Sequence, residues 1–210
     1  SFKNAMAGLP LGGGKAVILA GPDRTKSPEM LAAFGRAVET LGGRYVTAED
    51  VGIGVSDMQA VRRETRHVAG LPAAEGAVGG DPGPHTSYGV FLGIKAAVRR
   101  ALGRDSLKGL RLVLQGAGSV ASGVARRASE EGARLVIADV DAVKAARLAE
   151  ATGGEIAAPE EILGVEADIV SPNALGAILD DDSIAALKTP IVAGGANNQL
   201  ARPEHGAMLM

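Results

Sequence analysis

A glycine-rich turn between an apolar run and a helical pattern carries the clearest chemical signal in this 210-residue chain. Residues 116–121 read GAGSVA, with small residues at the first, third and sixth positions. The first glycine permits a tight turn, the second lets a ligand approach the backbone, and the small sixth residue permits close helix–strand packing. The N-terminus of the following helix suits a pyrophosphate group. The predicted dinucleotide-binding residues of this turn are Gly116, Ala117, Gly118, Ser119 and Val120.

An acidic residue beyond the next apolar run supports this prediction. Asp139 lies 21 residues after Gly118 (139 − 118), close to the roughly 20 expected for a carboxylate that binds the adenosine ribose hydroxyls. A carboxylate here repels a 2′-phosphate, and no arginine follows until Arg147, so the sequence favours NAD over NADP. Asp139 could instead cap the next helix, although Asp141 is better placed for that role.

A lysine behind three glycines is the second candidate for chemistry. Residues 12–15 read GGGK, but Leu9 and Ala16 stand where a P-loop needs glycine and serine or threonine. A lysine held at the start of an apolar strand can lose its proton near neutral pH when burial or a neighbouring cation disfavours its charge. Lys15 is equally consistent with a solvated lysine at a strand start.

Composition narrows the class of protein. The chain is 46% hydrophobic and 22% charged, which is typical of globular proteins. Its net charge of −2 offers no basic surface for nucleic acid. The absence of cysteine and the three scattered histidines predict no disulfide and no metal site. The longest apolar runs are far shorter than the ~18 residues of a membrane span. We expect a soluble, cytoplasmic protein with no membrane partner.

Two patterns of secondary structure divide the chain. From residue 110 onward, predicted strands (110–115, 134–138, 168–171, 190–193) alternate with predicted helices (120–131, 142–151, 181–187). Continuous apolar strands joined by helices indicate an α/β fold, a doubly wound parallel (Rossmann) sheet with helices on both faces.

The first third is more mixed. Short strands are predicted at residues 15–19 and 44–47, one helix after Ser27-Pro28, and another from a capping box at Ser56 to about His67. Residues 70–84 are rich in glycine and proline, and a long helix is predicted from Thr86.

Four segments of the chain match the motifs of one enzyme family in unbroken order. They are residues 3–15 (KNAMAGLPLGGGK), 47–52 (TAEDVG), 115–121 (QGAGSVA) and 194–199 (GGANNQ). These segments resemble the active-site, second catalytic, cofactor and substrate-side segments of the glutamate/leucine/phenylalanine/valine dehydrogenases. The second segment is closest to members that act on leucine. The resemblance implies a partial substrate domain (residues 1–72), a hinge (residues 73–85) and an NAD-binding Rossmann domain (residues 86–210) truncated at its C-terminus.

The resemblance also implies roles for three charged residues. Lys3 corresponds to the lysine that pairs with the substrate α-carboxylate, and Lys15 to the catalytic lysine that activates water. Asp50 corresponds to the aspartate that exchanges protons with the amine. These residue types suit oxidative deamination, because hydride loss from Cα leaves an iminium ion that water must attack with the help of a base.

Further binding residues follow from the same resemblance. Asn197 and Asn198 correspond to asparagines near the nicotinamide and the substrate carboxylate, although Asn198 could equally be structural. The backbone contact to the nicotinamide falls at Asn173 and Ala174. Ala48 corresponds to a small residue of the side-chain pocket.

The expected activity is NAD-dependent oxidative deamination of a branched-chain, leucine-like L-amino acid to the 2-oxo acid and ammonia. The alternatives are a phenylalanine or glutamate dehydrogenase of the same family and a catalytically silent nucleotide-binding relative. Because family members extend beyond both ends of this chain, which begins at Ser1 and stops at Met210, we expect an internal fragment of a protein that forms a homo-oligomer. His67 and His205 are expected on solvated helix faces, and His85 beside a helix start.

Overall fold

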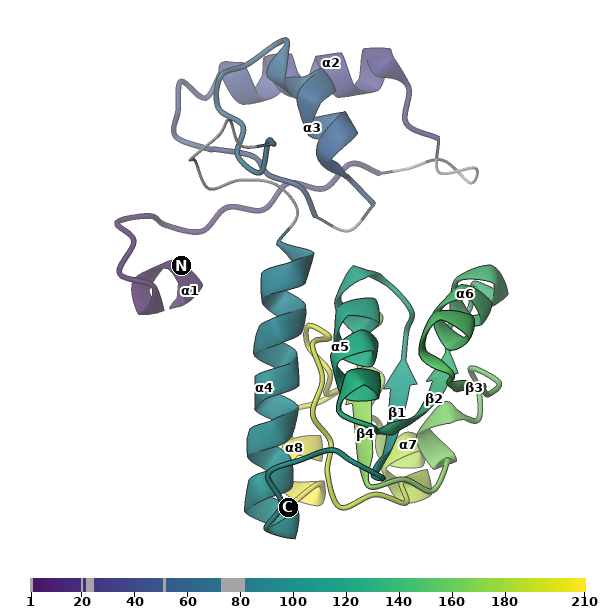
Figure 1. The fold of residues 1–210 in the computed structure, drawn as a ribbon. Helices are drawn as coiled ribbons and strands as arrows, with labels where there is room; N and C mark the ends of the chain where they lie inside the picture. The colour runs from purple at the N-terminus through teal and green to yellow at the C-terminus, as the bar shows by residue number, and fades with distance from the viewer. Residues whose placement is uncertain (1, 20, 22–24, 51, 73–81) are drawn as a thin grey trace. The chain divides into compact units, whose positions relative to one another are not determined.

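The computed structural model describes residues 2–19, 21, 25–50, 52–72 and 82–210. The chain separates into two compact units, Ser1–Pro82 and Gly83–Met210 (Figure 1). Most of the expected hinge, residues 73–81, lies outside the described residues, and Gly83 already begins a helix.

The first unit contains the helices α1 (Phe2–Met6), α2 (Pro28–Glu39) and α3 (Val55–Arg62). Helix α2 begins as predicted, because the Ser27 hydroxyl accepts the Met30 N–H at 3.2 Å and a proline occupies the first turn. Its apolar face packs on α3 in a small core of Leu31, Met58 and Val61.

Helix α3 differs from its prediction at both ends. Its N-cap is Gly54 rather than Ser56, and the Asp57 carboxylate accepts the Gly54 N–H at 2.9 Å. The helix ends at Arg62, well before His67. The predicted capping box was therefore misplaced by two residues, because the aspartate and not the serine makes the capping hydrogen bond.

The two strands predicted in the first unit are absent. Residues 15–19 have no regular structure, and residues 44–47 contribute only an isolated bridge between Thr47 and Val68. A strand is stable only when a neighbouring strand completes its hydrogen bonds. Within the described part of the chain residues 15–19 have no such neighbour, and Val17 and Leu19 are 76% and 91% exposed.

The second unit is built on a four-stranded parallel sheet in the order β3-β2-β1-β4. The strands are β1 (Arg111–Gln115), β2 (Arg134–Ala138), β3 (Glu155–Ile156) and β4 (Ile169–Pro172). The other elements are α4 (Gly83–Leu102), α5 (Ser119–Glu130), α6 (Ala142–Thr152), the 3-10 helix η1 (Ile162–Gly164), α7 (Asp181–Ala186) and α8 (His205–Met208). The predicted parallel α/β fold is confirmed. Strand β3 was not predicted, and the strand predicted at residues 190–193 is only a bridge from Val192 to Val170.

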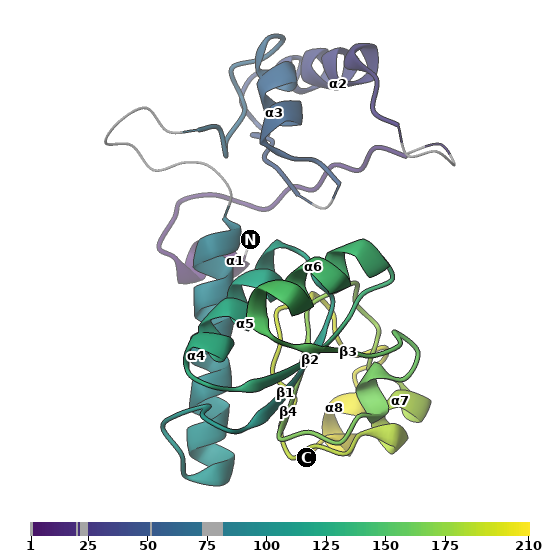
Figure 2. The ribbon, with the colours of Figure 1, turned by 45° about the vertical axis from the view of Figure 1, so that its right-hand side comes forward.

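Both faces of this sheet are covered. Leu112 and Leu114 of β1 face a core shared with α4, α5 and α6, whereas Val113 faces a second core with η1. Figure 2 shows α5 and α6 over one face and α7 over the other. Because the three central residues of β1 are buried on one side of the sheet or the other, they form a continuous apolar run between Arg111 and Gln115.

The register of the sheet brings three strand ends together. Gln115 at the end of β1 pairs with Ala138 of β2 and with Pro172 of β4. The segments that follow these strands therefore leave the same edge of the sheet, where open α/β folds bind their ligands.

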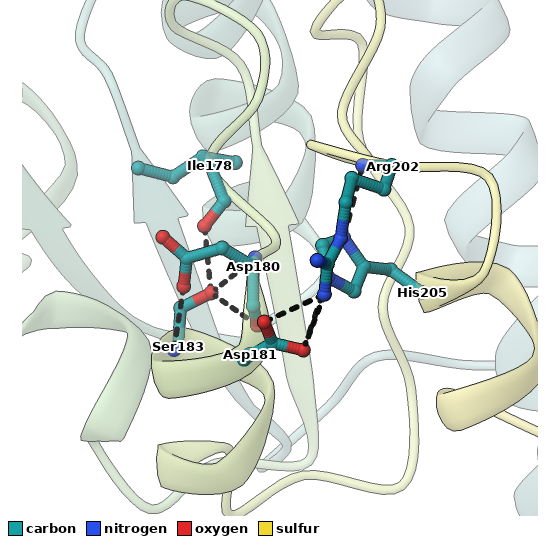
Figure 3. A network of polar contacts seen from close by, with 6 residues as sticks. All are labelled: Ile178, Asp180, Asp181, Ser183, Arg202 and His205. Carbon is teal, nitrogen blue, oxygen red and sulfur yellow. Dashed lines mark hydrogen bonds and ion pairs between the residues drawn. The ribbon is translucent and has the colours of Figure 1, made fainter.

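Two histidine predictions were wrong. His205 is only 1% exposed: its Nδ1 accepts the Arg202 N–H at 3.0 Å, and its Nε2 lies 3.3 Å from the Asp181 carboxylate (Figure 3). Arg202 also donates to both Asp181 oxygens at 2.9 and 2.7 Å, which joins the start of α8 to the start of α7. His67 lies outside α3, is half-buried, and sits 3.9 Å from Glu39.

The same network explains why α7 begins at its predicted residue. Asp180 accepts the Ser183 N–H, and the Ser183 hydroxyl accepts the Asp180 N–H, each at 2.8 Å (Figure 3). The hydrogen bonds from the backbone and side chain of Ser183 hold the pKa of Asp180 below its ordinary value.

Candidate functional site

The glycine turn connects β1 to α5 and requires glycine at its first position. Gly116 has φ +101°, and a Cβ atom there would lie 3.1 Å from both the backbone nitrogen and Cβ of Ala174. Its N–H donates to the Ala138 carbonyl at 2.7 Å. The turn is thus fixed against the ends of β2 and β4, as the fingerprint predicts for its first glycine.

Gly118 occupies a different environment. It is the exposed N-cap of α5, and a Cβ atom there would meet nothing within 4 Å. As a glycine, it makes no side-chain capping hydrogen bond. The open space and the helix N-terminus fit a pyrophosphate group, whereas the sixth position, Ala121, is buried in the helix–sheet packing.

Asp139 closes the turn from the neighbouring strand. One oxygen of its carboxylate accepts the Ala117 N–H at 2.7 Å and the other accepts the Asp141 N–H at 2.8 Å. Each oxygen keeps a second lone pair for a ribose hydroxyl. The helix-capping role belongs to Asp141, which accepts the N–H groups of Val143 and Lys144 at 3.1 and 3.2 Å.

The segment after β4 lies beside the same turn. The Asn173 N–H donates to the Gln115 carbonyl at 2.8 Å, and the Ala174 N–H donates to the Gln115 side chain at 3.3 Å. The Asn173 amide accepts the Gly195 N–H at 3.0 Å and donates to Ser171. The Asn173 side chain is therefore structural.

Residues 194–198 pack onto this segment through their backbone. The Ala177 N–H donates to the Asn198 carbonyl at 2.7 Å, and Asn198 has the left-handed φ of +47°. The side chains of Asn197 and Asn198 are exposed. The second unit thus brings the glycine turn, Asp139 and the segments at 173–174 and 194–198 to one edge of the sheet.

The first unit brings the two expected catalytic residues into contact. Lys15 Nζ and the Asp50 carboxylate form an ion pair, with side chains that are 71% and 49% exposed. Gly14 lies against the Tyr45 ring, where a Cβ atom would be 2.8 Å from Cδ2. Lys15 and Asp50 are therefore in contact. Of the two alternatives for Lys15, its exposure agrees with a solvated lysine rather than a buried one, and residues 15–19 do not form the predicted strand.

The two other expected substrate residues of the first unit are Lys3 and Ala48. Lys3 lies in α1, whose Asn4 amide donates to the Gly12 carbonyl at 2.5 Å and so ties this helix to the glycine run. Ala48 is exposed, two residues before Asp50. No group of metal-binding side chains occurs among the residues that the structure describes. The helices in that part of the chain are also too short or too polar to cross a membrane.

Comparison with known proteins places these features in a family. Residues 1–67 match the family model of the Glu/Leu/Phe/Val dehydrogenase, dimerisation domain. The leucine dehydrogenase of Geobacillus stearothermophilus is 46% identical over 209 residues, which cover 100% of this chain and 57% of that protein. The chain belongs to the Glu/Leu/Phe/Val dehydrogenase family.

Two solved dehydrogenases share the fold of this chain. The L-tryptophan dehydrogenase from Nostoc punctiforme has a TM-score of 0.71 and 39% identity, covering 99% of this chain and 58% of that one. The hetero-hexameric glutamate dehydrogenase from Thermus thermophilus, in its Leu-bound form, has a TM-score of 0.73 and 28% identity, covering 99% and 56%. The chain spans somewhat more than half the length of the dehydrogenases it matches.

The sequence did not predict the contact between two charged residues of the first unit. Lys26 pairs with Asp57 and donates to the Gly52 carbonyl at 2.8 Å, two residues beyond Asp50. Asp57 was interpreted only as part of a capping box. Because 31 residues separate the lysine from the aspartate, no local spacing pattern predicts the pair.

Proposed function

We propose that the full-length protein is an NAD-dependent amino-acid dehydrogenase that converts a branched-chain, leucine-like L-amino acid to the 2-oxo acid and ammonia. The observation that carries this proposal is the ion pair of Lys15 and Asp50 in a chain that also holds the glycine turn and Asp139. The leucine dehydrogenase of Geobacillus stearothermophilus, 46% identical, supports the same assignment. A catalytically silent relative would have no need of the assembled lysine–aspartate pair.

The second unit supplies a fitting site for the cofactor. The open position at Gly118 and the N-terminus of α5 would hold the pyrophosphate, and Asp139 would bind the adenosine ribose. The backbone at Asn173 and Ala174 would contact the nicotinamide. When bound, NAD supplies the acceptor for the hydride that leaves Cα.

Three residues of the first unit would bind the substrate and transfer protons. Lys3 would hold the substrate carboxylate and orient Cα. Lys15 would take a proton from the water that attacks the iminium carbon. Asp50 would carry a proton to the departing amine. Their direct contact suits this sequence, because a proton lost by one group is within reach of the other.

The partners we propose are the L-amino acid, its 2-oxo acid and further copies of the same chain. The matched family model is described as a dimerisation domain. The first unit also exposes large apolar side chains, which a subunit contact would cover. They include Phe2, Met6 and Leu19, each at least 90% exposed.

Cofactor choice is the first testable consequence. We expect NADH to bind at least about tenfold more tightly than NADPH, a difference of roughly 1.4 kcal/mol, because the Asp139 carboxylate repels a 2′-phosphate. Replacing Asp139 by alanine should narrow this gap in a fluorescence titration of the full-length protein.

Asp141→Ala is the matched control for that titration. It removes a neighbouring carboxylate that also accepts backbone N–H groups, but it should leave the ratio of the two affinities unchanged. Equal binding of NADH and NADPH by the unaltered protein would contradict the assignment.

The substrate side chain gives the experiment that tests the proposed function. Among the described cations of the first unit, Lys15 is paired with Asp50 and Lys26 with Asp57. Neither lysine is therefore free to bind a second carboxylate, and a glutamate γ-carboxylate buried there without a cation of its own would cost several kcal/mol. We therefore expect leucine and valine to be oxidised far faster than glutamate.

The test is to measure kcat/KM of the full-length protein for leucine, valine, phenylalanine and glutamate at one fixed concentration of NAD. Glutamate as the best substrate would overturn the proposal of an apolar pocket. Phenylalanine as the best substrate would select the aromatic alternative within the family.

A further inference from the structure

The loop that follows Asp50 is held by two side chains that the proposed chemistry does not use. Asp50 and Ile53 exchange backbone hydrogen bonds of 3.2 and 2.9 Å and so form the base of a tight turn. Lys26 Nζ donates to the Gly52 carbonyl at 2.8 Å, and Asp57 accepts the Gly54 N–H at 2.9 Å. Lys26 and Asp57 also form an ion pair with each other.

The glycines of this turn have no side chains whose packing could fix its conformation. Gly52 has φ +79°, a conformation that favours glycine, and Cβ atoms at Gly52 and Gly54 would meet nothing within 4 Å. Glycine also has the largest conformational freedom to lose on ordering. The hydrogen bonds of Lys26 and Asp57 therefore add side-chain restraints to the backbone pair of Asp50 and Ile53 in the described part of the turn.

The pair of Lys26 and Asp57 is less exposed than the pair of Lys15 and Asp50. The Lys26 and Asp57 side chains are 33% and 14% exposed, against 71% and 49% for Lys15 and Asp50. Partial burial opposes ionisation of Asp57, but the hydrogen bonds from Lys26 and the Gly54 N–H, with the lysine charge, outweigh it and lower its pKa. Asp57 therefore stays ionised at neutral pH and keeps both bonds.

We propose that Lys26 and Asp57 are positioning residues that fix the turn at residues 52–54 and thereby hold Asp50 against Lys15. The inference rests on the proposed function of Asp50 in proton transfer. A displacement of about 1 Å in a reacting group can cost on the order of 100-fold in rate. Loss of either partner should therefore lower turnover without removing any group that touches substrate.

The test compares Lys26→Met with Lys95→Met in the full-length protein. Lys95 makes an ion pair with Glu131, whose other oxygen accepts the Leu107 N–H at 3.1 Å, and the two side chains are 28% and 27% exposed. This control thus removes the same kind of pair from the second unit. We expect Lys26→Met to lower kcat roughly tenfold or more, with little change in KM or NADH affinity, and Lys95→Met to leave kcat within about twofold despite a similar loss of thermal stability.

Conservative variants distinguish an effect on the position of Asp50 from an effect on the stability of the fold. Lys26→Arg keeps a charged donor for both Gly52 and Asp57 and should recover most of the lost turnover. Asp57→Asn should resemble Lys26→Met in kcat. It should also reduce thermal stability at neutral pH, and this difference from the unaltered protein should shrink as the pH falls through the lowered pKa of Asp57.

Three outcomes would overturn the proposal. The first is a kcat within twofold in Lys26→Met, even if hydrogen exchange at residues 52–54 becomes faster. The second is an equal fall in kcat in the Lys95→Met control. The third is an unaltered protein that oxidises no amino acid, which refutes the proposed function itself; an active protein that needs Asp50 but not Lys26 refutes only the positioning role.

Discussion

Replacing Lys15 by alanine in the full-length protein should reduce turnover by at least about 100-fold, within the range of 10²–10⁴ that a positioned acid–base group contributes. The ion pair places Lys15 beside Asp50, so the substitution removes the base and leaves the aspartate without its cation. NADH affinity should remain nearly unchanged, because the glycine turn and Asp139 belong to the second unit. Steady-state oxidation of leucine and an NADH titration measure the two effects.

An exposed ion pair elsewhere provides the control for this experiment. Arg99 and Asp105 are 73% and 76% exposed, so Arg99→Ala removes a comparable surface contact and should leave turnover unchanged. Asp50→Asn should reproduce most of the loss seen in Lys15→Ala. A fall of less than about tenfold in Lys15→Ala would show that Lys15 is not the base.

The second unit could be predicted from the sequence because its signals are local. Strands β1, β2 and β4 are buried at their centres, and β1 and β2 contain the continuous apolar runs 112–114 and 135–138. The exposed strand β3 has only two residues and no such run, which is why it was not predicted. The helices that follow are marked by nearby caps, as at Asp141 and Asp180. The glycine turn and Asp139 are likewise defined by spacing within one strand–helix–strand unit, and the structure brings them into contact.

The first unit was less predictable because its contacts are non-local. The apolar run at residues 15–19 has the composition of a strand, but no described segment pairs with it. Lys15 and Asp50 are 35 residues apart (50 − 15), and only the resemblance to the dehydrogenases suggested that they meet. In the second unit His205 was misjudged for a related reason, since its partner Asp181 lies 24 residues earlier in the chain (205 − 181).

The two glycines of the dinucleotide turn should respond differently to substitution. Gly116→Ala requires a non-glycine residue at φ +101° and places a Cβ atom 3.1 Å from Ala174. Strain of this kind costs on the order of 1–3 kcal/mol, so we expect a lower melting temperature together with weaker NADH binding.

Gly118→Val should instead leave the fold nearly intact and abolish cofactor binding. The backbone of Gly118 is extended, with φ −74° and ψ −172°, and its Cβ position is empty. Valine is a poorer N-cap than glycine, but that change costs no more than about 1 kcal/mol. The added side chain occupies the space that we assign to the pyrophosphate, so NADH affinity should fall by at least about 100-fold, or roughly 2.7 kcal/mol. Thermal unfolding and NADH titration of the same samples separate the two effects. If Gly118→Val bound NADH as tightly as the unaltered protein, the pyrophosphate could not lie over the start of α5, because a valine side chain and a phosphate group cannot share one volume.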